Sequence, residues 1–191
     1  MRAVPGSPDI TCPLLPFARS SEASVRALTA SVQREGEGIL RFRYQLDAEL
    51  SALRIPAMSV SRRADELWKH TCFEAFIAGV PRGRSYHELN FSPSTEWAAY
   101  SFEGYRQGMT PVVAATPPRI DVSRAASQLV VDVRVAMQSL LPEPLRAVDA
   151  KLSIALSAVI ETDDGRISWW ALKHAPDKPD FHHAAGFILE V

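Results

Sequence analysis

The sequence has few of the residues that build metal centres and redox sites, because its 191 residues include only two cysteines, Cys12 and Cys72. No CxxC or HExxH spacing occurs, so the common zinc motifs are absent and we expect no metal site. A reducing compartment keeps such cysteines as thiols, and we predict that both are free. Cys72 lies in an apolar run, which favours a small buried side chain.

Long apolar runs are also missing. No segment approaches the ~20 consecutive apolar residues that span a bilayer. Prolines interrupt the N-terminal sequence MRAVPGSPDITCPLLPF, which lacks the continuous apolar segment of a signal peptide. We therefore expect a cytoplasmic protein with no membrane partner. The 21 basic and 22 acidic side chains give a net charge of -1, whereas nucleic-acid-binding domains usually carry a basic excess, so we expect no nucleic-acid partner.

Common enzyme signatures do not occur. The chain has no GxSxG, no P-loop and no GxGxxG, and this favours a non-enzymatic role. One catalytic alternative stays open, in which Glu74 and Glu88 act as an acid/base pair on a sugar substrate. The sequence does not give the separation of these two carboxyl groups, and it leaves the oligomeric state open.

Alternation of apolar and polar residues dominates the rest of the chain. The expected strands cover residues 24–35, 39–46, 70–80, 86–91, 97–102, 129–135, 151–161, 166–172 and 186–191. The sequences REGEG and ETDDGR between successive strands predict hairpins. Long helical periodicity and βαβ patterns are absent, so we predict an all-β, antiparallel sandwich with few short helices. We expect one domain over residues 21–191, preceded by an irregular, proline-rich segment over residues 1–20.

Polar side chains occur inside two of these expected strands. Glu74 is flanked by Cys72, Phe73, Ala75 and Phe76, and a carboxylate in such surroundings is costly unless it has a partner. It would either bind the hydroxyl groups of a ligand or make a buried link to another side chain. Tyr86, Glu88 and Asn90 share one face of the next strand. That face is either part of the same polar surface or simply exposed to solvent.

Aromatic and basic residues near strand ends supply further candidates. Trp68 and Trp97 lie beside loops, and flat aromatic rings of this kind can pack on the faces of sugars. Trp169 and Trp170 are adjacent, so they point to opposite faces of one strand, and one of them is expected in the core. Lys69, beside Trp68, and His174, in a loop, can contribute hydrogen bonds to a site or cap turns.

Three segments, DELWKHTCFEAFI, YHELNFSPSTEWAAYSFEGYR and SAVIETDDGRISWWALKHAPDKPDFHHAAGFILEV, together resemble the DOMON-like family, which is related to family 9 carbohydrate-binding modules. Trp68 opens the motif, Glu74 matches its carboxylate, and Tyr86, Asn90 and Trp97 match positions that follow. Thr71 stands where sugar-binding members have an acidic residue. The resemblance covers roughly residues 62–191 and implies an immunoglobulin-like β-sandwich that binds a small ligand in a pocket of one sheet.

The resemblance implies a carbohydrate, or another sugar derivative, as the ligand. Haem b is the alternative, and the resemblance then implies Met109 with His174 or Lys69 as the iron ligands. For the carbohydrate, stacking would come from tryptophans and hydrogen bonds from carboxylates, amides and basic groups. The expected ligand-binding residues are Trp68, Lys69, Glu74, Tyr86, Glu88, Asn90, Trp97, Trp169, Trp170 and His174.

Overall fold

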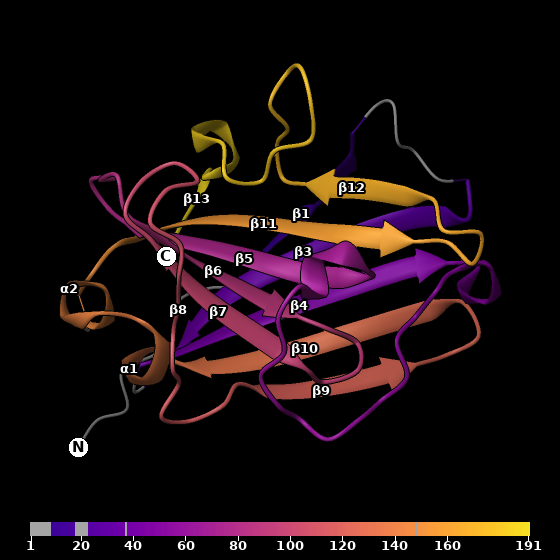
Figure 1. Cartoon of the computed structure of the whole chain (residues 1–191), viewed down its shortest axis with the longest axis horizontal. Coiled ribbons are helices and arrows are strands. Elements are labelled where there is room, and N and C mark those ends of the chain that lie inside the picture. The colour runs from indigo at the N-terminus through magenta and orange to yellow at the C-terminus, as the bar shows by residue number, and fades with distance from the viewer. Residues whose placement is uncertain (1–8, 18–22, 37, 148) are drawn as a thin grey trace.

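The computed structural model describes residues 9–17, 23–36, 38–147 and 149–191, and it consists of two antiparallel sheets packed face to face (Figure 1). Among these residues, one sheet has five strands and the other has eight. The predicted all-β sandwich with few short helices is therefore confirmed. No helix in the described ranges has the length and apolar character needed to cross a membrane.

The five-stranded sheet is organised around a long hairpin. β3 (Val25–Glu35) and β4 (Ile39–Ala48) pair along their length, as the alternation predicts. β10 (Gln128–Ala136) pairs with the other side of β4. β1 (Ile10–Pro13) and β9 (Arg119–Arg124) form the two edges of this sheet.

In the eight-stranded sheet, β5 (Cys72–Gly79) lies between β11 (Leu152–Glu161) and β6 (Tyr86–Phe91), so it is the inner strand that its apolar sequence predicts. The remaining strands are β7 (Trp97–Phe102), β8 (Thr110–Pro111), β12 (Ile167–Ala171), β2 (Leu15–Pro16) and β13 (Leu189–Glu190). β11 and β12 form the predicted hairpin, and Gly165 in its turn has the positive φ of 84° that glycine adopts readily.

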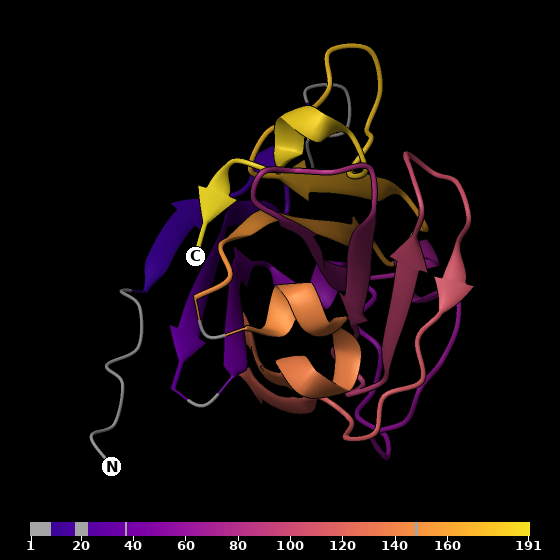
Figure 2. The same ribbon diagram turned by 90° about the vertical axis from the view of Figure 1, so that its left-hand side faces the viewer.

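The helices are single turns. They are η1 (Leu50–Ala52), η2 (Leu67–Lys69), α1 (Met137–Leu140), α2 (Glu143–Arg146) and η3 (Ala184–Gly186). Figure 2 shows α1 and α2 covering one end of the sandwich. η2 leads directly into β5, and η3 belongs to the loop before β13.

The core lies between the sheets because each strand turns one set of alternate residues inward. On β4, the even-numbered residues from Leu40 to Leu46 are fully buried, whereas Arg41 and Arg43 point outward. Tyr44 is one of the inward residues, and its hydroxyl donates a hydrogen bond of 2.8 Å to the backbone carbonyl of Glu74 in the opposite sheet. The inward side of β5 is therefore committed to packing, and only its outward side is available for a site.

One expectation about an irregular segment is wrong, and two further strands were not predicted. Within the supposedly irregular residues 1–20, β1 pairs with β3 and β2 pairs with β12, so these edge strands complete both sheets; residues 1–8 and 18–20 lie outside the described part. The connection that follows Phe102 contains β8, and β9 comes after it with alternating Ile120 and Val122. Both cysteines are free thiols, as predicted.

Candidate functional site

The outward face of the eight-stranded sheet carries the polar residues that the alternation singles out. Glu74 on β5 is paired in register with Asn90 on β6, and Ser157 on β11 is on its other side. Glu88 lies two residues from Asn90 on the same face. The two strands therefore are neighbours, and their carboxyl groups are diagonal cross-strand neighbours.

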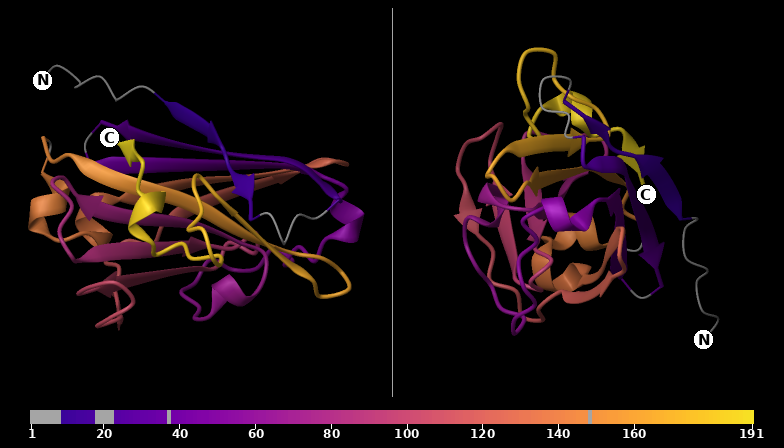
Figure 3. Two further views of the ribbon diagram at one scale, coloured as in Figure 1. Left: turned by 90° about the horizontal axis from the view of Figure 1, so that it is seen from above. Right: turned by 90° about the vertical axis from the view of Figure 1, so that its right-hand side faces the viewer.

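A cavity of about 340 Å³ opens over these residues. Its lining residues are Trp68, Glu74, Glu88, Phe102, Arg106, Met109, Val159, Trp169, Pro179, Phe181 and His182. The sheet supplies the floor, and the walls come from η2, the turn between β7 and β8, and the loop that follows β12. Figure 3 shows this last segment, coloured toward yellow, crossing the strands of the sheet. Cavities of ~300–1,000 Å³ with a few polar groups among aromatic walls are typical ligand sites.

Glu74 is the most unusual residue in the cavity. It is 2% exposed, and its Oε1 atom is buried without a hydrogen-bond partner among the described residues. Burial, followed by repulsion from Glu88, raises the pKa of Glu74 well above its usual 4.5. The shift favours the neutral acid, which can both donate and accept hydrogen bonds.

Glu88 is better supported than Glu74. Its Oε1 atom accepts a hydrogen bond of 2.7 Å from the amide Nδ2 of Asn90, and its Oε2 atom is 3.7 Å from Nε2 of His182. Burial raises the pKa of Glu88 despite the bond from Asn90. The cavity therefore contains two acids whose pKa values are raised, and Oε1 of Glu74 has no counterpart to the hydrogen bond that Oε1 of Glu88 accepts from Asn90.

A neutral histidine faces these acids. The hydroxyl of Tyr86 accepts the backbone N–H of Arg106 at 3.2 Å and lies 2.7 Å from Nδ1 of His182, so the two side chains share a hydrogen bond. Burial, reinforced by the positive charge of Arg106, lowers the pKa of His182 to about 4. When Tyr86 donates this bond, the neutral ring carries its proton on Nε2, and His182 then presents an N–H donor to the Glu88 side of the cavity.

A buried aspartate, Asp180, connects the loop after β12 to the turn after β7. Asp180, with a side chain 3% exposed, accepts hydrogen bonds from Arg106 Nη2 at 2.9 Å, from the Tyr105 hydroxyl and from the backbone N–H of His182. Burial opposes ionisation here, but the bonds from Tyr105 and Arg106 outweigh it and lower the pKa of Asp180. The loop after β12 and the turn after β7 are thereby held together.

The two tryptophans of the cavity are Trp68 and Trp169, both half-buried. Trp68 packs edge-on against Tyr100, with ring centroids 5.6 Å apart. Phe102 and Phe181 complete the aromatic walls. Of the predicted residues, Trp68, Glu74, Glu88 and Trp169 line the cavity, and Tyr86 and Asn90 hydrogen-bond to His182 and Glu88, which line it.

Four predicted site residues lie elsewhere. Trp97 and Trp170 belong to the core between the sheets, at 4% and 5% exposure, because their parity on β7 and β12 points them inward. Lys69 forms an ion pair of 2.7 Å with Glu66 on the surface, and His174 donates from Nε2 to the carbonyl of Leu15 at 2.7 Å. We therefore correct the expected ligand-binding set by removing these four.

Arg106, Phe181 and His182 were not in the expected ligand-binding set. The loop that contains His182 suggests from its sequence either a lining for a ligand site or residues that cap turns, and nothing local places it over β6. Arg106 has a positive φ of 54°, which is uncommon for an arginine and marks a tight turn. The signal that could have located it is the short GYRQG sequence immediately after a strand.

Comparison with solved structures shows a similar fold in a known protein. The fold resembles the crystal structure of a protein from Bacteroides uniformis described as a "putative carbohydrate-binding protein", with a TM-score of 0.67 over 93% of this chain and 84% of that one. The two sequences are 11% identical, so the likeness establishes the fold alone. No family model matches the chain, and no curated protein matches it either.

Proposed function

We propose that the protein binds a small carbohydrate, or a derivative of one, in the cavity over β5 and β6, without chemical turnover. The observation that carries this proposal is that Glu74 lines the cavity while its buried Oε1 atom has no hydrogen-bond partner among the described residues. An unpartnered buried polar atom is unfavourable unless a bound group satisfies it. The chemistry of a sugar hydroxyl, which donates and accepts, matches the protonated carboxyl group.

The walls of the cavity suit the rest of such a ligand. Trp68 and Trp169 provide flat apolar surface for the C–H face of a sugar ring, and its contact would remove both surfaces from water. Glu88 and the Nε2 proton of His182 provide further hydrogen bonds at the floor. The resemblance to the DOMON-like family and the name of the structural neighbour point to the same class of ligand.

Tryptophan fluorescence offers a direct test, because two of the four tryptophans line the cavity and the other two lie in the core. Titration with a panel of mono- and oligosaccharides is expected to give a saturable change with at least one member. Glu74→Leu should weaken that binding on the order of tenfold, because the hydroxyl loses a buried partner. Glu190→Leu, an exposed position on β13, is the matched control. Absence of saturable binding across the panel by both fluorescence and calorimetry would sink the proposal.

Two alternatives have weaker support. For haem b, only Met109 of the expected iron ligands lines the cavity, whereas His174 and Lys69 have other partners; a Soret band on addition of haem would favour this reading. For a sugar hydrolase, Glu74 would serve as the protonated acid and Glu88 as the ionised base, and only the raised pKa of Glu74 supports this pairing. Release of reducing sugar from an oligosaccharide panel would favour hydrolysis over binding.

A further inference from the structure

A second hollow, of about 530 Å³, lies beside the cavity and differs from it in charge. Its lining residues are Arg82, Gly83, Arg84, Tyr86, Tyr105, Gln107, His182, His183 and Ala184. The set contains two guanidinium groups, two imidazoles, an amide and two phenol hydroxyls. It contains no carboxylate, although the whole chain has slightly more acidic than basic residues.

The two arginines carry charges that the protein itself does not neutralise. Arg82 and Arg84 lie on the exposed turn between β5 and β6, and neither makes an ion pair or hydrogen bond within the described part of the chain. The Arg82 guanidinium sits 4.6 Å from the ring centroid of Phe187, a cation–π contact that restrains it. Restrained guanidinium groups are well suited to bind the oxygens of phosphates and carboxylates.

Two other polar groups of the hollow, His183 and Gln107, also present donors. Nδ1 of His183 accepts the backbone N–H of Ala185 at 3.2 Å, so the neutral ring carries its proton on Nε2. Gln107 adds an amide. The buried acid Asp180 is already occupied by Arg106 and Tyr105 and does not line the hollow.

The hollow and the cavity are built from the same two loops. His182 lines both of them. On the turn after β7, Arg106 lines the cavity while Tyr105 and Gln107 line the hollow. In the loop after β12, Phe181 lines the cavity and His183 the hollow. The two spaces are therefore adjacent, and a ligand that extends past His182 would contact both.

We propose that the hollow binds the oxyanion of a ligand whose sugar ring occupies the cavity, so that the ligand class is an anionic sugar carrying a phosphate or a carboxylate. This inference rests on the proposed function for the position of the ring. Arg82 and Arg84 bind the oxyanion, and His183 and Gln107 complete its hydrogen bonds. The cavity contributes recognition of hydroxyl groups, and the hollow contributes recognition of charge.

Isothermal titration calorimetry with three matched ligands tests this assignment: a neutral hexose, its 6-phosphate and the corresponding hexuronic acid. An anionic sugar is expected to bind at least about tenfold more tightly than the neutral hexose. The double variant Arg82→Gln/Arg84→Gln should lose that gain and keep the affinity for the neutral hexose. Arg124→Gln, an exposed arginine on β9 of the other sheet, is the control and should retain the gain. The anionic sugar that shows the gain distinguishes phosphate from carboxylate.

The outcomes separate this inference from the proposed function. Equal affinity for the neutral and both anionic sugars would overturn the anion subsite and leave the carbohydrate site intact. If no sugar binds, the proposed function fails, and titration with inorganic phosphate and with acetate examines the hollow alone. Binding of either anion that Arg82→Gln/Arg84→Gln abolishes would then support the subsite, and no binding of either would overturn it.

Discussion

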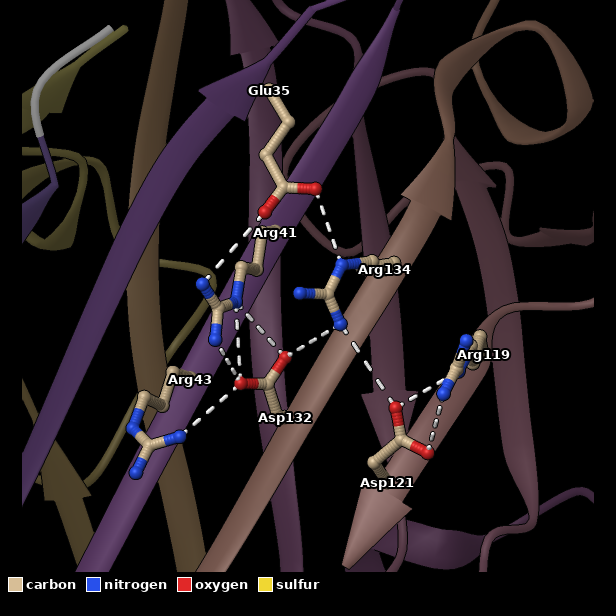
Figure 4. A network of polar contacts seen from close by, with 7 residues as sticks. All are labelled: Glu35, Arg41, Arg43, Arg119, Asp121, Asp132 and Arg134. Carbon is tan, nitrogen blue, oxygen red and sulfur yellow. Dashed lines mark hydrogen bonds and ion pairs between the residues drawn. The ribbon is translucent and has the colours of Figure 1, made fainter. Parts of the chain in front are cut away.

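The outward faces of the two sheets place carboxyl groups on neighbouring strands in opposite electrostatic settings. On the five-stranded sheet, Asp132 of β10 accepts hydrogen bonds from Arg41 at 3.0 Å and from Arg43 at 3.2 Å, and Arg134 is 3.4 Å away (Figure 4). Burial alone would raise the pKa of Asp132, but the bonds from Arg41 and the other charges lower it. On the eight-stranded sheet, burial raises the pKa of both Glu74 and Glu88.

The difference comes from what covers each face. The face in Figure 4 is a lattice of alternating charges that also includes Glu35, Arg119 and Asp121, each partly open to water. Each acid there has an arginine within reach across a strand. The other face is covered by the loop after β12, and the nearest arginine, Arg106, is committed to Asp180. We infer that the acids of the first face have their partners within the protein, whereas the second face leaves polar groups that a ligand can satisfy.

Removing Asp180, which holds that covering loop in place, should have the largest effect on stability and on ligand binding. Asp180→Ala deletes the acceptor for Arg106, Tyr105 and the backbone of His182. We expect the free energy of unfolding to fall by about 2–3 kcal/mol, measured by urea denaturation, together with loss of ligand binding. Asp121→Ala, on an exposed strand of the other sheet, should change stability far less. Similar losses for the two variants would remove the distinction between the faces.

The pH dependence of stability should differ for the acids of the two faces. The pKa of Glu74 is raised above its usual 4.5 in the folded protein, so the unfolded chain releases this proton first as pH increases. Stability contributed by the protonated acid is full below about pH 4.5 and is lost as pH rises toward the folded pKa, by up to about 1.4 kcal/mol per pH unit for one group. Asp132 behaves in the opposite sense. Its pKa is lowered in the folded protein, so the stability that its ionised form contributes is present above its usual pKa of 3.8 and is lost as pH falls below that value.

Glu74→Gln isolates the first of these effects, because glutamine keeps the shape and cannot ionise. Urea unfolding at a series of pH values between 4.5 and 8 should show that the free energy of unfolding of the variant increases relative to that of the unmodified protein as pH increases. Glu190→Gln is the exposed control, and its free energy of unfolding should have the same pH dependence as that of the unmodified protein. His182 is unchanged in both comparisons, so its own titration between the usual 6.5 and about 4 cancels in the difference. A difference that does not vary with pH would mean that Glu74 is ionised and paired.

Much of the fold follows from local sequence patterns, and the site follows from them only in part. The alternation in YHELNF predicts that Tyr86, Glu88 and Asn90 share a face, and the inner position of β5 explains why Glu74 lies beside them. Parity also predicts that one of Trp169 and Trp170 is buried. It does not say which, because this depends on the sheet into which β12 pairs.

The remaining residues of the site depend on contacts between distant segments. Arg106 and Asp180 are 74 positions apart, and Tyr86 and His182 are 96 apart. No periodicity encodes such meetings, which are set by two loops closing over a sheet. The position of Trp97, by contrast, follows from strand periodicity. Trp97 is three residues from Tyr100, so the two rings lie on opposite faces of β7 and could not both line one cavity.

Neutralising Asp132, at the centre of the charge lattice, should have a moderate effect on stability. Asp132→Asn removes one negative charge from among three arginines while keeping the side-chain shape. We expect a loss of about 1 kcal/mol in the free energy of unfolding at low salt, and a smaller loss at 1 M NaCl, because screening weakens partly exposed charges. Urea denaturation at the two salt concentrations measures both. A loss that is independent of salt would show that packing, rather than charge, explains the role of Asp132.

The smallest effect is expected at the rim of the same lattice. Arg119 pairs with Asp121 at 2.9 Å, and the side chains are 73% and 49% exposed. Water screens such a pair and ordering the two side chains has an entropic cost, so Arg119→Gln should change the free energy of unfolding by less than about 0.5 kcal/mol. Asp121 is also 3.9 Å from Arg134, which in turn contacts Asp132. A loss as large as that of Asp132→Asn would therefore mean that the lattice acts as one cooperative unit, and a double-mutant cycle between the two positions would measure that coupling directly.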